Sequence, residues 1–172
     1  MTLPPAALRR PTLLVVGCGD VGLRVLRLLG GRLRVLALTS SPERAGVLRA
    51  AGAVPLQGNL DHPATLARLA GLADWILHLA PPPGQGANDP RTQALVQALM
   101  RSPRVSRLVY ASTSGVYGDA AGARFDETRM PAPQSDRSAG TANAGEPMNT
   151  TRRPVVVLGS LASRACAAAR SR

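Results

Sequence analysis

The stretch LLVVGCGDVG (residues 13–22) joins an apolar run to the spacing G-x-G-x-x-G, whose glycines are Gly17, Gly19 and Gly22. The motif stands where an expected strand ends and an expected helix begins. In such a turn Gly17 permits the tight bend, Gly19 lets the backbone approach a pyrophosphate, and Gly22 lets the helix pack closely on the strand. The helix N-terminus would present free N–H groups to the phosphates. The motif predicts a dinucleotide-binding turn, and a glycine-rich turn without a ligand is the alternative.

Three other residues complete this turn. Asp20 and Val21 open the expected helix and are predicted to belong to the cofactor-binding segment. Asp20 fits a cap or first-turn carboxylate better than a catalytic group, and Cys18 fits a small packing residue in a tight turn.

Around this turn, short apolar runs alternate with helical patterns, which is typical of βαβ units. The runs are almost continuously apolar, as expected of parallel strands that are covered on both faces. We therefore predict an α/β fold, a Rossmann-type doubly wound parallel sheet of about five strands. The expected strands are residues 13–17, 33–38, 53–56, 75–79 and 107–112.

Helical spacing and capping residues predict four helices between these strands. The first should carry its apolar residues at helical spacing and stop at the glycine pair 30–31. The second should start at Ser41, which precedes a proline. The third should follow Asp61 as its N-cap, and the fourth should run from about residue 90 to 101 and end before a proline. Their expected apolar positions are Val21, Val25, Leu28 and Leu29 in the first, Leu66 and Leu69 in the third, and Leu95, Ala98 and Leu99 in the fourth.

The chain changes character after about residue 112, where Gly, Ala, Pro, Ser and Asp become dominant. We expect a dinucleotide-binding domain over residues 1–137 and an irregular or disordered tail over residues 138–172. Within the tail, residues 154–158 could form one more strand and residues 161–170 a basic, alanine-rich helix. The tail's composition is compatible either with a shifted reading frame in GC-rich DNA or with a natural short form.

Composition narrows the class of protein. The formal net charge is +11, but all 21 basic residues are arginines spread along the chain, and only one Trp, two Tyr and one Phe are available for base stacking. This looks like a compositional bias, so we expect no specific nucleic-acid binding. No apolar run reaches the roughly 20 residues of a membrane-spanning helix. The two cysteines and the lack of an evident export signal favour a reducing, cytoplasmic location, and no metal site is expected.

The end of the second expected strand bears on the choice between NAD and NADP. NAD-specific folds usually place an acidic residue there to bind the ribose hydroxyls, but no acidic residue occurs between Val21 and Pro42. The strand instead ends in Thr39 and Ser40, with Arg44 in the next helix. Hydroxyls and a guanidinium suit the 2′-phosphate of NADP, although they could equally be a helix cap and a solvated side chain. The sequence favours NADP, with NAD as the alternative.

Four segments together resemble the extended and atypical short-chain dehydrogenase/reductases, the NAD-dependent epimerase/dehydratase family. These segments are G-x-G-x-x-G at 17–22, G-N-L at 58–60, H-L-A-P-P at 78–82 and A-S-T-S-G-V-Y-G at 111–118, and the last is the most specific. The similarity covers about residues 12–137. It implies a nucleotide-sugar epimerase, dehydratase or related oxidoreductase that acts on a small-molecule or sugar-nucleotide substrate.

This resemblance also implies roles for individual residues. Asn59 and Leu60 would line the adenine pocket, where the family usually has Asp followed by an apolar residue. Ala80 and Pro81 would pass beneath the nicotinamide ribose. Thr113 would donate the hydrogen bond to the substrate oxygen during hydride transfer. The alternatives are a turn residue for Asn59 and an ordinary loop hydroxyl for Thr113. His78, in the third of the four segments, could be a core histidine at a strand end.

One departure from the family affects catalysis. The family's catalytic pair is Tyr-x-x-x-Lys, and its spacing from Thr113 places Arg137 and Thr141 at the two positions. An arginine is locked in its charged form, so it cannot replace the tyrosine as a general acid. The sequence therefore predicts an NAD(P)-binding protein without this pair, and a non-catalytic dinucleotide sensor or regulatory protein is the alternative.

Overall fold

The computed structural model describes residues 10–102, 104–111, 114–119, 129–136, 138–140, 142 and 155–158. These residues build a parallel six-stranded sheet of order β3-β2-β1-β4-β5-β6. The strands are β1 (Thr12–Val16), β2 (Arg34–Thr39), β3 (Ala53–Gln57), β4 (Trp75–His78), β5 (Arg107–Ala111) and β6 (Val155–Leu158). The strand order reverses beside β1, because β2 and β3 extend the sheet to one side and β4 to β6 extend it to the other. In such sheets the reversal opens a crevice at the carboxyl ends of the strands.

The five expected strands are confirmed, each within about two residues of its expected bounds. The sixth strand lies in the expected tail, at the residues 154–158 that we noted could form one more strand. Its residues 155–158 pair in parallel with residues 108–111 of β5, so that part of the tail extends the sheet.

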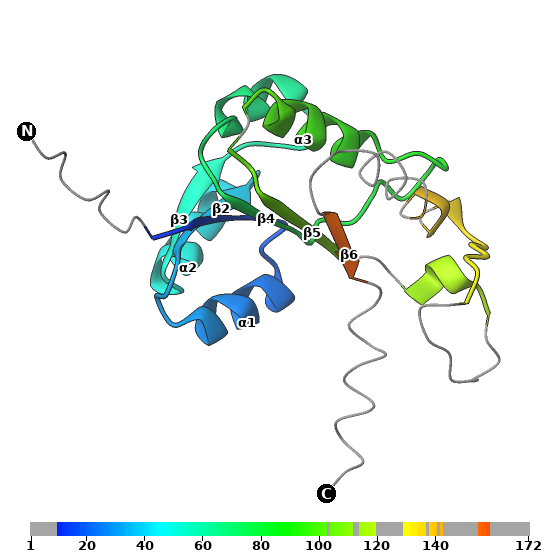
Figure 1. Ribbon diagram of the computed structural model, residues 1–172, viewed down its shortest axis with the longest axis horizontal. Helices are drawn as coiled ribbons and strands as arrows, with labels where there is room; N and C mark the ends of the chain where they lie inside the picture. Colours follow the sequence, from blue (N-terminus) through cyan, green and yellow to red (C-terminus); the bar gives the residue numbers. More distant parts are fainter. Residues whose placement is uncertain are drawn as a thin grey trace, which may run out of the picture.

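Helices cover the two faces of the sheet (Figure 1). Helices α1 (Asp20–Leu29) and α2 (Ala45–Ala50) lie on one face, and α3 (Pro90–Met100) lies on the other. Three short 3₁₀ segments complete the connections: η1 (Pro42–Arg44), η2 (Pro63–Leu69) and η3 (Ser114–Tyr117). The sheet thus separates two apolar clusters. One contains Leu66, Leu95 and Tyr110, and the other contains Leu26 and Leu48.

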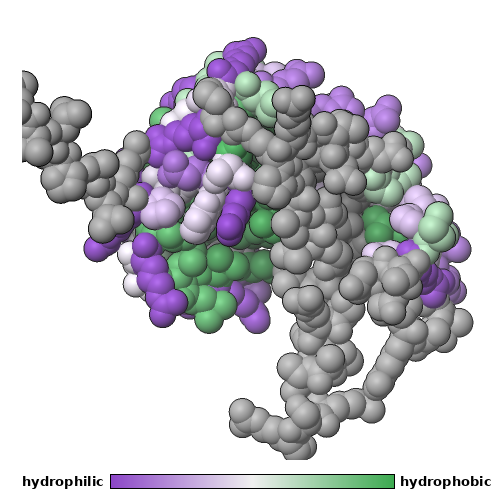
Figure 2. All heavy atoms as spheres, viewed as in Figure 1, coloured by the Kyte–Doolittle hydropathy of each residue, from purple (hydrophilic) through white to green (hydrophobic). Residues whose placement is uncertain are grey.

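Helix α1 has the expected bounds, but its buried face differs from the simplest reading of its apolar spacing. The buried positions are Gly22 and Leu26, whereas Val21 is 42% and Leu28 is 80% exposed. Hydrophobic surface is visible around α1 in Figure 2. The close approach of Gly22 to the sheet turns these two side chains outward. The helix ends as predicted, because Gly30 adopts the left-handed conformation with φ of 52°.

The third helix differs from the prediction in type and in its cap. It is the 3₁₀ segment η2, and His62 rather than Asp61 stands at its N-cap position, without a side-chain cap. Asp61 is instead engaged by Arg91. The inward residues Leu66 and Leu69 are fully buried, as predicted. The sequence predicted Leu66 and Leu69 correctly because buried positions must be apolar. It did not predict the role of Asp61, because its ion-pair partner Arg91 lies far away along the chain.

The other two helix starts agree with the sequence. Ser41 is the N-cap residue of η1 and is followed by proline, although its backbone N–H bonds to Thr39 Oγ1 and its own side chain forms no cap. At α3 the side chain of Asp89 accepts a hydrogen bond from the Thr92 N–H. No helix within the described ranges has the length and apolar character needed to cross a bilayer.

Candidate nucleotide-binding site

A cavity of about 350 Å³ opens at the carboxyl ends of the strands, beside the point where the strand order reverses. Its walls are the turn after β1, the end of β2 with η1, the turn after β3, the residue Ala80 after β4, and Arg91 in the first turn of α3. This is where doubly wound sheets place their ligands.

Most of the predicted cofactor-binding residues contribute to this cavity. Those on its walls are Gly17, Gly19, Thr39, Ser40, Arg44, Asn59, Leu60 and Ala80. Asp20, Val21, Gly22 and Pro81 are not among its lining residues. Thr113 lies outside the described residues, as do Arg137 and Thr141. The cavity also has walls that the sequence did not indicate, including Asp61 and Arg91.

The three motif glycines occupy different environments. Gly17 has φ of 80°, and a Cβ there would collide with the backbone of Ala80. A Cβ on Gly22 would lie 2.9 Å from Cys18 Sγ and 3.5 Å from Leu79 Cδ1, which reflects the close packing of α1 against the sheet. Gly19 differs, because a Cβ there would meet nothing within 4 Å while the residue lines the cavity. Gly17 and Gly22 thus allow neighbouring parts of the fold to pack closely. Gly19 instead leaves open space beside the backbone in the cavity.

The N-terminus of α1 lies at this open position. Gly19 is the N-cap residue and supplies no side-chain cap, so the first N–H groups of the helix are not covered by a capping side chain. Asp20 is exposed and forms an ion pair of 3.0 Å with Arg24, one turn further along the helix. Asp20 is therefore the first-turn carboxylate that we expected.

Arg44 connects the end of β2 to the glycine-rich turn. Its Nη2 donates a hydrogen bond of 2.8 Å to the backbone carbonyl of Cys18. Burial raises the pKa of the Cys18 thiol, an effect that the nearby Arg44 charge partly opposes. Cys18 is thus a packing residue, and the Arg44 guanidinium stands on the cavity wall between the turn and the β2 hydroxyls.

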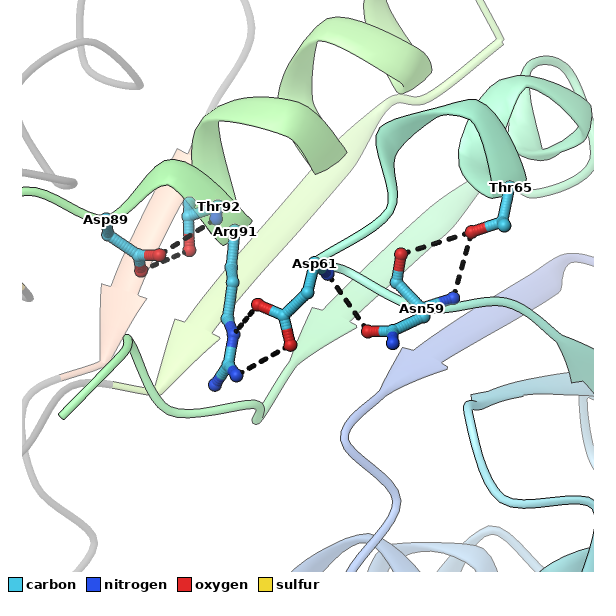
Figure 3. A network of polar contacts seen from close by, with 6 residues as sticks. All are labelled: Asn59, Asp61, Thr65, Asp89, Arg91 and Thr92. Carbon is cyan, nitrogen blue, oxygen red and sulfur yellow. Dashed lines mark hydrogen bonds and ion pairs between the residues drawn. The ribbon is translucent and has the colours of Figure 1, made fainter.

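The turn after β3 is fixed by its own polar side chains (Figure 3). Asn59 Oδ1 accepts a hydrogen bond of 2.9 Å from the Asp61 N–H, and Thr65 Oγ1 accepts one of 2.9 Å from the Asn59 N–H. The single hydroxyl proton of Thr65 lies within hydrogen-bonding reach of two carbonyl oxygens, that of His62 at 2.7 Å and that of Asn59 at 3.1 Å. The side-chain oxygen of Asn59 therefore stabilises the turn. Its side-chain nitrogen Nδ2 has no hydrogen-bond partner among the described residues.

A bidentate ion pair crosses from this turn to α3 (Figure 3). Arg91 Nε lies 2.6 Å from Asp61 Oδ1, and Arg91 Nη2 lies 2.8 Å from Asp61 Oδ2. The hydrogen bonds from Arg91 lower the pKa of the Asp61 carboxyl, and the same contact raises the pKa of Arg91. Because 30 residues separate the partners, local patterns in the sequence give no signal for this pair.

A second polar network is buried beneath the start of α3. His78 Nε2 lies 2.7 Å from Thr92 Oγ1, the Thr92 hydroxyl donates to Asp89 Oδ2, and the Tyr110 hydroxyl reaches the same carboxylate at 3.3 Å. Since the Thr92 proton is given to Asp89, His78 Nε2 must carry the hydrogen in this contact. His78 Nδ1 has no hydrogen-bond partner among the described residues. Burial lowers the pKa of His78 to about 4, so the ring is neutral. The histidine is thus a core residue tying β4, β5 and α3 together.

Ser135 and Ser138 join the end of the expected dinucleotide-binding domain to the first residue of the expected tail. Ser135 N–H donates to Ser138 Oγ at 3.1 Å, and Ser138 N–H donates to Ser135 Oγ at 3.3 Å, which is a reciprocal cap. The described residues 136, 138–140 and 142 are helical. Asp136 accepts a hydrogen bond of 3.0 Å from the Gly86 N–H. A helix therefore begins near residue 136 in the described part of the chain. No group of three potential metal-ligating side chains occurs within the described ranges.

The sheet order and the cavity beside the glycine-rich turn define a doubly wound protein of the dinucleotide-binding class. Comparison with known proteins agrees. A family model described as NAD(P)H-binding matches residues 17–142, and the chain belongs to this family.

Individual relatives are oxidoreductase-type enzymes and epimerases. The chain is 34% identical over 116 residues to the 4-hydroxy-2-methyl-3-oxo-4-farnesyl-3,4-dihydroquinoline-1-oxide ketoreductase of Stigmatella aurantiaca, covering 63% of this chain and 35% of that enzyme. It resembles the UDP-glucose 4-epimerase of Thermotoga maritima with a TM-score of 0.71 at 19% identity, over 86% of this chain and 54% of the epimerase. The Thermus thermophilus UDP-glucose 4-epimerase in complex with NAD gives 0.69 at 23% identity, over 86% and 54%. The chain thus spans about a third of the ketoreductase and about half of each epimerase.

Proposed function

We propose that this NAD(P)-binding protein binds NADP(H) through the cavity, with the pyrophosphate over Gly19 and the N-terminus of α1. The observation that carries the proposal is the continuity of the cavity from the open side of Gly19 to the Arg44 guanidinium. Backbone N–H groups and a helix N-terminus suit the pyrophosphate, and a guanidinium suits a phosphate monoester. Gly17, Asp20, Val21 and Gly22 would hold this segment in shape.

The preference for NADP over NAD rests on the polar groups at the end of β2. Thr39 Oγ1 is occupied by the backbone of Ser41, with which it makes two contacts of 3.2 Å. The hydroxyl of Ser40 and the guanidinium of Arg44 are then the groups offered to a 2′-phosphate. Arg44 uses one N–H on Cys18, and a guanidinium has five N–H donors, so donors remain for a ligand. The adenine would lie near Asn59 and Leu60, and the nicotinamide end would pass Ala80 and Pro81.

When bound, the cofactor would supply hydride transfer, and its substrates would be ketones or sugar nucleotides, by analogy with the ketoreductase and the epimerases. Thr113 is proposed to hold the substrate oxygen. The step also needs a group that can move a proton near neutral pH, and Arg137 and Thr141 stand in place of the family's tyrosine and lysine. We infer that this chain alone binds the dinucleotide without family-type turnover.

A non-catalytic dinucleotide sensor is the second candidate, and the buried network favours it. His78 and Tyr110 are both buried, and Tyr110 bonds to the Asp89 carboxylate, so neither side chain is available to a substrate. The cysteine content and the cofactor class make a reducing, cytoplasmic location part of the proposal.

The direct experiment is fluorescence titration of the purified chain with NADPH and with NADH. We expect saturable enhancement with both, and a lower dissociation constant for NADPH. Equal constants would reject the NADP preference, and a flat titration with both would reject the proposed cofactor site. A panel of ketones and sugar nucleotides, followed at the nicotinamide absorbance band, then separates an enzyme from a sensor.

A further inference from the structure

We propose that the amino-terminal edge of the sheet is a docking surface for a membrane that contains anionic lipids. This edge consists of residues 10–12, 27–34, 70–74, 100–102 and 104–107, and we call it the basic edge. None of these residues lines the cavity, which opens at the other end of the strands. The inference therefore goes beyond the proposed function and does not depend on it.

Backbone hydrogen bonds join these segments into one continuous surface. The Arg34 N–H donates to the carbonyl of Pro11 at 3.2 Å, which joins the start of β2 to that of β1. The Asp74 N–H donates to the carbonyl of Thr12 at 2.9 Å, and the Ser106 N–H donates to the carbonyl of Asp74 at 2.8 Å. The amino ends of β2, β1, β4 and β5 thus follow one another along the edge.

The fold gathers on this edge arginines that are scattered along the sequence. The only carboxylate among its described residues is Asp74, which Arg104 binds through two contacts of 2.9 and 3.1 Å. The helix dipole accounts for Arg27 and Arg101, which stand at helix ends, but not for the other arginines. Six arginines are exposed and form no ion pair with a described residue: Arg10, Arg27, Arg32, Arg34, Arg101 and Arg107.

Acidic side chains stand at the opposite edge, which gives the molecule a charge direction. Asp20, Glu43 and Asp61 follow the carboxyl ends of β1, β2 and β3. An anionic surface attracts the basic edge and repels these carboxylates. The protein would therefore dock with its cavity facing away from the membrane and open to the cofactor.

Exposed apolar side chains on the basic edge favour a lipid surface over a nucleic acid. Leu28 is 80% exposed in the last turn of α1, and Met100 is 58% exposed at the end of α3. The two helices cover opposite faces of the sheet, so these side chains flank the edge on both sides (Figure 1). On docking they would enter the interfacial layer while the arginines bind lipid phosphates. The one tryptophan, Trp75, has the Arg107 guanidinium 5.7 Å from its ring centre and is not offered for base stacking.

The test is co-sedimentation of the full chain with vesicles of phosphatidylcholine and phosphatidylserine, and with vesicles of phosphatidylcholine alone. We expect saturable binding to the anionic vesicles that weakens as salt is added, and much weaker binding to the neutral ones. Arg32→Ala and Arg101→Ala should each weaken binding about fivefold, because one arginine at the lipid surface is lost. Leu28→Ser should weaken it about tenfold, because an apolar side chain no longer leaves water.

Two matched controls come from one segment off the basic edge, which bonds to Val116 after the carboxyl end of β5 through the Ala132 N–H. Arg129→Ala removes the same charge, and Met130→Ser removes an apolar side chain that is 79% exposed. Both variants should bind the anionic vesicles within about twofold of the parent, since screening limits the reach of a distant charge. Thermal unfolding and NADPH titration should be the same for every variant, which reports an intact fold and cavity.

Equal binding to the two kinds of vesicle, or binding to neither, overturns the inference and leaves the proposed function standing. If Arg129→Ala loses as much affinity as Arg32→Ala, only the net charge of the chain acts and the inference is overturned. It is also overturned if Leu28→Ser binds vesicles like the parent while the arginine variants lose affinity for double-stranded DNA to the same extent, since the edge then binds polyanions in general. Vesicle binding as expected without any NADPH binding would reject the proposed function and leave this inference standing.

Discussion

The guanidinium of Arg44 donates a hydrogen bond of 2.8 Å to the backbone carbonyl of Cys18, the residue between the first two glycines of the motif. A side chain from the η1 segment is thereby fastened to the turn after β1. The remaining N–H donors of Arg44 are therefore held at one place on the cavity wall, and the side chain does not sample many rotamers in solvent. This limits the rotamer entropy that a phosphate contact would cost.

Arg44→Ala is expected to narrow the preference for NADPH over NADH by about 1 to 3 kcal/mol, because a charge-assisted contact to the 2′-phosphate is lost. The measurement is the pair of dissociation constants for each protein. Affinity for NADH should change much less, since it lacks the phosphate. If both affinities fall by the same factor, Arg44 supports the turn and does not read the phosphate.

Gly19→Val should abolish dinucleotide binding while the fold persists. A Cβ at Gly19 meets no protein atom within 4 Å, so the branched side chain would occupy the ligand's space. The control is Gly46→Ala, an exposed glycine in α2 with equally open surroundings, which should bind normally and gain up to about 1 kcal/mol of stability. Unchanged NADPH affinity in Gly19→Val would disprove the pyrophosphate assignment.

His78 predicts an acid-sensitive fold. Its pKa is about 4 in the folded protein, against an ordinary value of 6.5. Between these values the unfolded chain binds a proton that the folded protein does not. The free energy of unfolding should therefore fall as the pH drops from about 6.5 toward 4, by up to roughly 3 kcal/mol.

Denaturant unfolding at a series of pH values measures this slope. The upper half of the window is diagnostic, because carboxylates begin to titrate below it. His62→Gln, which removes the exposed histidine, should keep the slope, and His78→Gln should flatten it. Identical slopes in the two variants would contradict the assignment.

Thr92→Val should destabilise the protein by about 1 to 3 kcal/mol, although the two side chains have nearly the same shape. The hydroxyl links His78 to Asp89 in the interior, so its removal leaves both without this buried partner. The free energy of unfolding at neutral pH checks this expectation, and a change below about 0.5 kcal/mol would show that the link carries little.

The chain is expected to show no family-type hydride transfer, even where it binds NADPH. A missing acid or base costs about 10² to 10⁴ in rate, and loss of substrate orientation costs more. The check is a sensitive assay with NADPH, sugar nucleotides and small ketones. Robust turnover that disappears in Thr113→Ala would mean that another group replaces the tyrosine and lysine.

Sequence patterns predicted the sheet well because burial on both faces forces apolar runs, and those runs are visible locally. The glycine-rich turn was also predicted from local sequence, because its defining residues lie within six consecutive positions. Asp61 was misread as a helix cap, because a cap and an ion-pair partner look alike until the partner is known. Arg91 gave no signal at all, since its role depends on a contact across 30 residues. The sixth strand could be suggested from its valines but not placed, because its pairing with β5 is not encoded locally.

The pairing of β1 with β4 has a consequence for the order of folding. Residues 12–57 form β1, β2 and β3 with α1 and α2 between them, so these strands meet through contacts close in sequence. Leu13 of β1 must instead find Trp75 of β4 across the whole intervening chain, a slower closure. The glycine-rich turn can thus form early, whereas Ala80 and Arg91 reach the cavity only after this closure. A dinucleotide would then bind only the state in which β1 and β4 are paired. Its binding would stabilise the product of this slow closure.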